Sequence, residues 1–121
     1  MGYYSKAAFA AITVFARNIV VFSLAVGIGM LIAKIFCDID PKENYSWISG
    51  IWHGMFSFPN YVRNLFNSEI VYKIENGSFM YNVFYAIIAI PEFASITIEL
   101  IKIVISPILA VIVVVANKRI K

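Results

Sequence analysis

Two oppositely charged residues near the carboxyl end are the first candidates for chemistry. Glu99 and Lys102 lie three positions apart in an apolar stretch, so on a helix their side chains share one face. If this stretch crosses a membrane, such a pair is costly in hydrocarbon and by default faces protein or water. The pair then either lines a pathway for ions, or lies near the membrane boundary as a salt bridge with Lys102 reaching the headgroups. We favour the boundary interpretation.

Arg17 raises the same choice near the amino end. It interrupts an apolar run and is followed by the polar Asn18. The side chain either anchors the helix at the interface on the side of the chain ends or is a charge buried in the membrane. We favour the interfacial anchor.

The residues most often used in catalysis and metal binding are scarce. Cys37 is the only cysteine and His53 the only histidine, so one chain can form neither an internal disulfide nor a zinc site made only of Cys and His. His53 stands between Trp52 and Gly54 and is interpreted as an interfacial aromatic. We therefore expect no catalytic residue, no metal and no cofactor.

The composition indicates a membrane protein. The chain is 61% hydrophobic and 14% charged, whereas soluble domains contain roughly 25% charged residues. Its mean hydropathy is +0.82. The net charge is +3, but the basic residues do not form a stripe among exposed aromatics, so nucleic acid is not an expected partner.

The first expected membrane span is 18–36, which is about 28 Å long as a helix and close to the thickness of the hydrocarbon core. Residues 7–16 extend the apolar pattern backwards, so either the helix is long and tilted or Arg17 lies within the membrane. We interpret this region as an uncleaved anchor rather than a signal peptide. Ala25, Gly29 and Ala33 place small residues on one face, which predicts helix packing there.

An aromatic-rich loop, 37–78, separates the apolar regions and is expected on the non-cytoplasmic side. Trp and Tyr favour the headgroup level. Apolar spacing before Pro59 predicts a short amphipathic helix, and the alternation over 69–75 indicates a brief strand or an extended linker. The expected interfacial side chains are Trp47, Trp52, His53 and Tyr61.

The carboxyl-terminal region is expected to be kinked or broken. Ser78 is a plausible N-cap for a short helix over 79–90. Pro91 followed by Glu92 resembles a helix start, so a second span is expected over 91–117 with a kink or break near Pro91. Whether 79–90 is interfacial, re-entrant or continuous with that span stays open.

Basic residues flank the two spans on the side of the chain ends, which predicts that both termini are cytoplasmic. The central loop carries more acidic than basic residues, as the opposite side allows. The basic residues concerned are Lys6, Arg17, Lys118, Arg119 and Lys121.

The central region resembles a group of small uncharacterised bacterial membrane proteins over roughly 50–84. The shared pattern is a Trp-His-Gly segment, a proline, a Ser-Leu-Phe, and an Asn-Gly stretch that leads to Trp-Tyr-Asp-Phe. This chain departs from it at Asn64, Phe79 and Asn82, where the pattern has Ser, Trp and Asp. The resemblance implies a bacterial source and a shared interfacial element, and it carries no activity to any residue. The matching residues are Gly50-Ile51-Trp52-His53-Gly54, Pro59, Leu65-Phe66, Asn76-Gly77-Ser78, Tyr81 and Phe84.

Taken together, these patterns predict an all-α membrane protein with two transmembrane helices and an interfacial aromatic segment. We expect a non-enzymatic subunit or scaffold of an assembly in the bacterial inner membrane, in contact with lipid and with other subunits or itself. The alternative is a homo-oligomeric ion channel or holin-like pore. An intramembrane enzyme would need clustered His, Asp, Ser or Cys inside the spans. The single His and single Cys lie at the boundaries, so we do not expect an enzyme.

Overall fold

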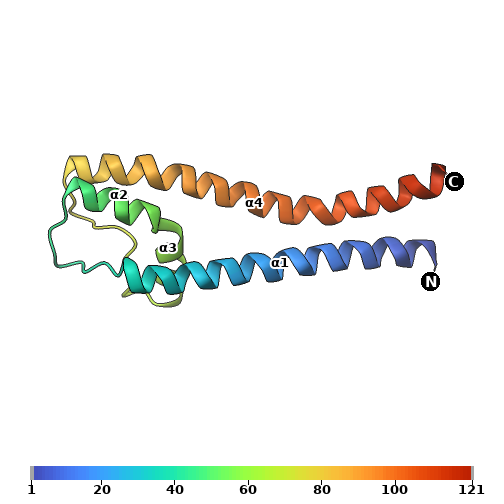
Figure 1. Cartoon of the computed structure of the whole chain (residues 1–121), viewed down its shortest axis with the longest axis horizontal. Coiled ribbons are helices and arrows are strands. Elements are labelled where there is room, and N and C mark those ends of the chain that lie inside the picture. Colours follow the sequence, from blue (N-terminus) through green and yellow to red (C-terminus); the bar gives the residue numbers. More distant parts are fainter. Residues whose placement is uncertain (1, 121) are drawn as a thin grey trace. The chain divides into compact units, whose positions relative to one another are not determined.

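Four helices form the computed structural model, which describes residues 2–120. They are α1 (Tyr3–Phe36), α2 (Trp47–Met55), α3 (Ser57–Phe66) and α4 (Phe79–Ile120) (Figure 1). Irregular segments join them, and the described residues contain no strand. The expected all-helical class is confirmed for this part of the chain, and Lys121 lies outside it.

The chain divides into two compact units, and each contains part of both long helices. The first unit comprises the described residues up to Leu24 and from Thr97 onward. The second unit is Ala25–Ile96 and holds α2, α3 and both connecting segments.

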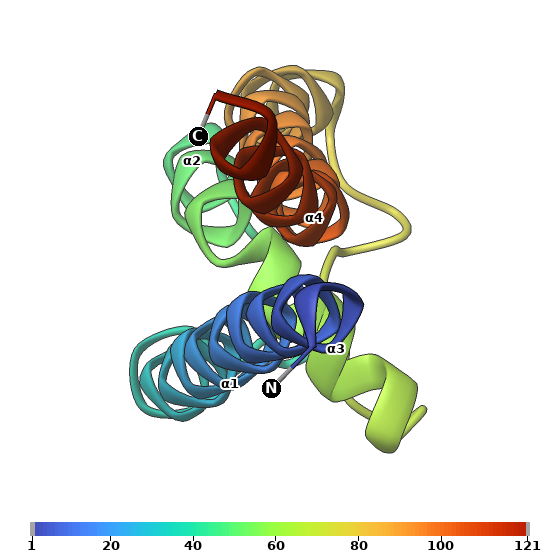
Figure 2. The same cartoon turned by 90° about the vertical axis from the view of Figure 1, so that its right-hand side faces the viewer.

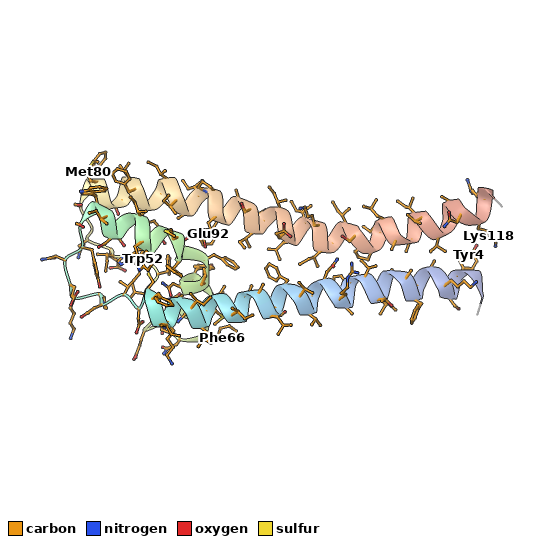
Figure 3. All side chains as sticks on the ribbon, in the orientation of Figure 1. Tyr4, Trp52, Phe66, Met80, Glu92 and Lys118 are labelled. Atoms are coloured by element: carbon orange, nitrogen blue, oxygen red, sulfur yellow. The ribbon has the colours of Figure 1, made fainter. Side chains whose placement is uncertain are left out.

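The two long helices are apolar and largely uncovered. α1 has 34 residues and α4 has 42, lengths of about 51 Å and about 63 Å at 1.5 Å per residue. Only 6% of the most apolar window of each helix is buried. Both helices are therefore long and apolar enough to cross a membrane. Figure 3 shows side chains along the length of both helices. The exposed apolar ones include Leu24, Ile28, Leu31, Ile101, Val104, Ile108 and Val113.

α4 is one continuous helix, so 79–90 and 91–117 are not two separate helices. A break near Pro91 was the wrong alternative. The proline removes one hydrogen-bond donor, but the residues on both sides of it remain helical. The expected N-cap is confirmed, since the backbone N–H of Tyr81 donates to Ser78 Oγ over 3.2 Å.

The aromatic-rich region contains two helices where the sequence predicted one. α2 is the expected short helix, whereas α3 was missed because Pro59 was interpreted as the end of helical structure. Pro59 instead lies in the first turn of α3. Backbone N–H groups have no partner within the helix in that turn, so proline is tolerated. Residues 69–75 form bends and turns rather than a strand, which leaves the alternative of a linker.

In the second unit, α2 lies beside the beginning of α4 (Figure 2), next to a small core formed by α4 and the two connecting segments. Two glycines one helical turn apart allow this approach. A Cβ on Gly50 would lie 2.5 Å from the carbonyl oxygen of Tyr81, and one on Gly54 would lie 2.9 Å from Ile88 Cβ. The spacing is the small-xxx-small arrangement that brings helices close. The buried core residues are Cys37, Ile39, Ile74, Tyr81, Tyr85 and Ala89.

Candidate functional site

A buried hydrogen-bond network in the second unit is centred on Tyr81, which is fully buried on α4. Its hydroxyl oxygen accepts the backbone N–H of Ile74 over 3.2 Å and lies 2.6 Å from His53 Nδ1. Because the oxygen already accepts from Ile74, the hydroxyl proton is free to go to His53. Tyr81 therefore ties the loop before α4 to the last turn of α2.

His53, which the sequence suggested to be an interfacial aromatic, is buried within the second unit. His53 is 4% exposed, and its ring packs edge-on against Tyr45 and Tyr81. Burial lowers the pKa of His53 to about 4. The imidazole is thus neutral near pH 7, and its Nδ1 accepts a hydrogen bond from the Tyr81 hydroxyl, which places the ring's own proton on Nε2.

A second buried group caps the carboxyl end of α1. Asn60 on α3 is fully buried and donates from Nδ2 to the carbonyl oxygen of Cys37 over 3.0 Å. Its Oδ1 accepts from Arg63 over 2.8 Å, and Arg63 also pairs with the exposed Asp38 at 3.4 Å. Trp52 Nε1 adds a bond of 2.7 Å to the carbonyl oxygen of Phe36. Side chains of α2 and α3 therefore satisfy carbonyls that the helix end leaves without intrahelical partners.

The thiol of Cys37 lies within this cluster and is not activated. Burial is the main reason that its pKa rises to about 11. A thiol with a raised pKa stays protonated near pH 7, and the thiolate is the nucleophilic form. Cys37 acts as a core residue.

Glu92 has a different structural role from the one that the sequence suggested. The sequence suggested an acid at a helix start, but Glu92 lies inside α4 and points toward α3 (Figure 3). Its carboxylate accepts from Ser57 Oγ over 3.1 Å and from the backbone N–H of Phe58 over 3.4 Å. Both donors belong to the first turn of α3, whose N-cap Phe56 offers no capping side chain. Glu92 therefore caps α3 from another helix.

The three other expected interfacial residues lie at least partly on the surface. Trp47 is 47% exposed and Tyr61 is 37% exposed. Trp52 is 42% exposed even though its ring nitrogen is bonded to α1. The outer face of α2 continues this surface with Ile48 and Met55.

The small residues of α1 are used within the chain. Ala33 is fully buried, and a Cβ on Gly29 would lie 3.5 Å from Pro59 Cγ of α3. Ala25 is exposed. Two of the three expected packing residues thus face the protein's own second unit, where α3 meets α1.

The charged candidates of the first unit lie on its surface. Glu99 Oε1 and Lys102 Nζ are 3.3 Å apart, and their side chains are 54% and 65% exposed. Arg17 is also exposed. Glu99 and Lys102 thus form the salt bridge that the boundary interpretation includes. The position of this pair relative to a membrane stays a prediction.

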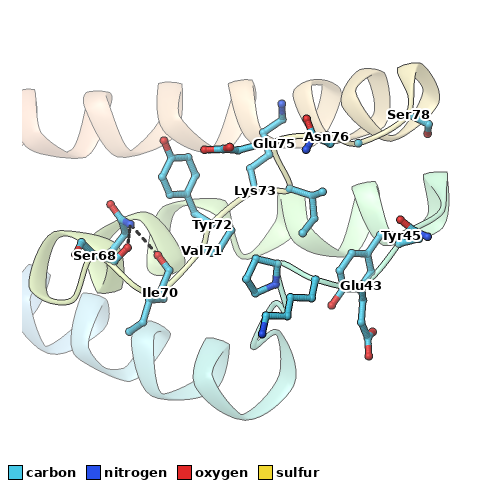
Figure 4. A pocket seen from close by; sticks show the side chains of 16 residues that line it. Glu43, Tyr45, Ser68, Ile70, Val71, Tyr72, Lys73, Glu75, Asn76 and Ser78 are labelled. Atoms are coloured by element: carbon cyan, nitrogen blue, oxygen red, sulfur yellow. Dashed lines mark hydrogen bonds between the residues drawn. The ribbon is translucent and has the colours of Figure 1, made fainter.

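A hollow of about 950 Å³ lies between the two connecting segments of the second unit (Figure 4). One wall carries Lys42 and Glu43, and the other carries Lys73 and Glu75. The two lysines and two glutamates balance in charge, so the hollow selects neither an anion nor a cation by charge alone.

Among the residues that the structure describes, no three His, Cys, Asp or Glu side chains come together as metal ligands. The sequence did not single out Asn60 or Arg63, and it indicated Tyr81 only as part of the family pattern. The only sequence signal for these side chains is a polar residue among apolar and small ones. This signal does not identify the group to which the side chain is hydrogen-bonded.

The fold and these contacts define an all-helical protein with two long apolar helices and a compact, internally hydrogen-bonded helical unit. No protein-family model matches the chain, and no curated protein or solved structure gives a significant match.

Proposed function

We propose that this chain is an integral membrane protein, anchored by α1 and α4, that acts as a non-enzymatic subunit or scaffold of a larger membrane assembly. The observation that carries the proposal is the contrast between the uncovered apolar helices and the paired polar groups of the second unit. Apolar surface on this scale favours lipid or protein over water. We further propose a bacterial inner membrane, which the resemblance of the central region implies. The basic residues near the chain ends favour a cytoplasmic location for both termini.

The second unit supplies the docking surface in this proposal. Among its described residues, Asn82 Oδ1 is the only buried side-chain polar atom without a hydrogen-bond partner, so the unit holds its shape through its own contacts. The outer face of α2 then presents Ile48, Trp52 and Met55, which are 60%, 42% and 51% exposed. An exposed face of aromatic and flexible apolar side chains suits a protein partner at the membrane surface.

Extraction and purification from native membranes test the proposal. The tagged full chain is expected to stay in the membrane pellet during an alkaline wash and, after mild solubilisation, to elute with other proteins in fixed stoichiometry. Release by the wash contradicts the membrane anchor. A protein that remains in the pellet but elutes with no other protein contradicts the scaffold.

A matched pair of variants locates the docking surface. Ile48→Lys puts a charge on the outer face of α2, so it should remain in the pellet and lose the partners. Lys42→Ala changes a nearby loop and should keep them. Equal retention of partners by both variants would exclude the α2 face.

A pore is the second candidate, and the exposed ion pair of α4 is the observation that favours it. Charged side chains within apolar segments commonly mark ion pathways. Purified protein in lipid vesicles should then conduct ions, and Glu99→Gln should change the conductance or its selectivity. Vesicles without conductance, or a conductance indifferent to Glu99→Gln, would leave only the scaffold.

A further inference from the structure

The part of α4 within the first unit carries a polar stripe, defined by Glu99, Lys102 and Ser106. Successive residues on a helix are about 100° apart, so these three positions fall within an arc of about 60°. Val113 continues the same face two turns later and is 57% exposed. The spacing of three and four residues is the pattern by which one helix meets another along its length.

Among the residues that the structure describes, the polar stripe has more hydrogen-bonding capacity than its contacts use. Lys102 Nζ donates to Glu99 Oε1 over 3.3 Å, but an ammonium has three donors and a carboxylate about four acceptor sites. Ser106 Oγ donates to the carbonyl oxygen of Lys102 over 2.6 Å and can still accept. Away from bulk water, in the membrane or at its boundary, unmet capacity of this kind favours burial against another protein surface.

We propose that a second copy of this chain covers the polar stripe, so that two α4 helices pack in parallel about a two-fold axis. The inference rests on the proposed membrane anchoring, which gives both copies the same orientation.

Charge complementarity identifies the occupant as a second copy. Glu99 and Lys102 differ in height by about 4.5 Å along the helix, so across a two-fold axis Glu99 of one copy can reach Lys102 of the other in both directions. The two carboxylates and two ammoniums alternate around the axis, and the face is complementary to itself. A different partner would need a cation facing Glu99 and an anion facing Lys102.

Cross-linking of single cysteines in native membranes tests the pairing. With Cys37→Ala as the background, Val113→Cys leaves the polar stripe intact and is expected to give a covalent dimer with a short bis-maleimide. Ile108→Cys is the matched control, because Ile108 is 56% exposed and lies on the far side of α4. Equal cross-linking at the two positions, or a product containing another protein, overturns the proposal.

Charge variants in the Val113→Cys background test the stripe itself. Glu99→Lys should reduce the dimer at least about tenfold, because both Glu99–Lys102 contacts across the axis are lost and only lysines face one another. Adding Lys102→Glu restores an alternating arrangement and should restore the dimer. A dimer unaffected by Glu99→Lys, or one that the double variant does not recover, contradicts the charge pairing.

Alkaline extraction of the same samples separates the two proposals. Loss of the chain from the membrane pellet contradicts the membrane anchoring itself. A chain that stays in the pellet without Val113→Cys cross-linking contradicts only the dimer. A membrane dimer that purifies without other proteins keeps this inference and contradicts the scaffold.

Discussion

At the scale of single residues, the second unit depends on polar side chains that each connect two elements. Tyr81 bonds to His53 on α2 and to the backbone of Ile74, and Asn60 joins α3 to the end of α1. Buried polar groups cost free energy unless they are paired, and removal of one partner leaves the other unpaired. Single substitutions should therefore have larger effects here than on the exposed helices.

Tyr81→Phe tests this expectation most directly. Loss of the hydroxyl leaves the His53 nitrogen and the Ile74 N–H without their partner, so the variant should be destabilised by about 1–3 kcal/mol. Thermal unfolding in detergent, followed by circular dichroism, measures the change. Tyr61→Phe removes the same group from a partly exposed ring and should melt close to the parent protein. Similar melting of both variants would contradict a role for the buried hydroxyl.

The pKa of His53 predicts a pH dependence of stability. Burial lowers it to about 4, against about 6.5 in an unfolded chain. The folded protein therefore binds fewer protons between these values, so its stability is complete above about pH 6.5 and declines as the pH falls toward 4. The shift corresponds to a loss of at most about 3 kcal/mol.

Comparison with a variant that lacks the imidazole isolates the contribution of His53 to the pH dependence of stability. His53→Asn keeps a hydrogen-bond acceptor but does not titrate, so the difference in melting temperature between parent and variant should narrow as the pH is lowered from about 7 to about 4. A difference that is constant over this range would show that His53 does not titrate as its burial implies.

At the scale of elements, close helix approach is the main organising feature of the second unit. Gly50 and Gly54 bring α2 against the α4 backbone, while Glu92 on α4 caps α3. The loop before α4 is held in the same place by Tyr85, whose hydroxyl donates to the carbonyl oxygen of Tyr72 over 3.0 Å. α2, α3 and the beginning of α4 thus depend on one another.

Gly50→Ala tests the approach of the two helices. The added Cβ would lie 2.5 Å from a backbone oxygen of α4, so the helices must separate and the variant should lose about 1–3 kcal/mol of stability. Gly27→Ala is the matched control, because nothing lies within 4 Å of its Cβ, and it should be neutral or slightly stabilising. If the two variants melt at the same temperature, α2 does not pack on α4 in this way.

At the scale of the whole molecule, the apolar helices govern where the chain can reside. Each exceeds the roughly 30 Å of a hydrocarbon core, so each can cross once and still extend beyond it. One crossing by each helix places both chain ends on one side of the membrane and both connecting segments on the other.

Labelling with a membrane-impermeant maleimide tests this topology. In a Cys37→Ala background, Lys42→Cys should react from outside intact cells, whereas Asn117→Cys should react only after the membrane is opened. The reason is the basic carboxyl end, which favours the cytoplasmic side. Labelling of both positions from the same side would contradict an anchor in which each helix crosses once.

The sequence alone determined the features that depend on local pattern. Apolar composition predicted the two spans but not that 79–120 form one helix, the apolar spacing before Pro59 predicted α2, and Ser78 predicted the beginning of α4. These properties follow from neighbours within one or two helical turns. Only the tertiary structure decided that His53 is buried, that Glu92 caps α3, and that Gly50 and Gly54 rather than Ala25 make a close helix contact. Such contacts join residues far apart in the chain, 28 positions for His53 and Tyr81, and a local pattern does not specify which partner folding will bring to a polar side chain.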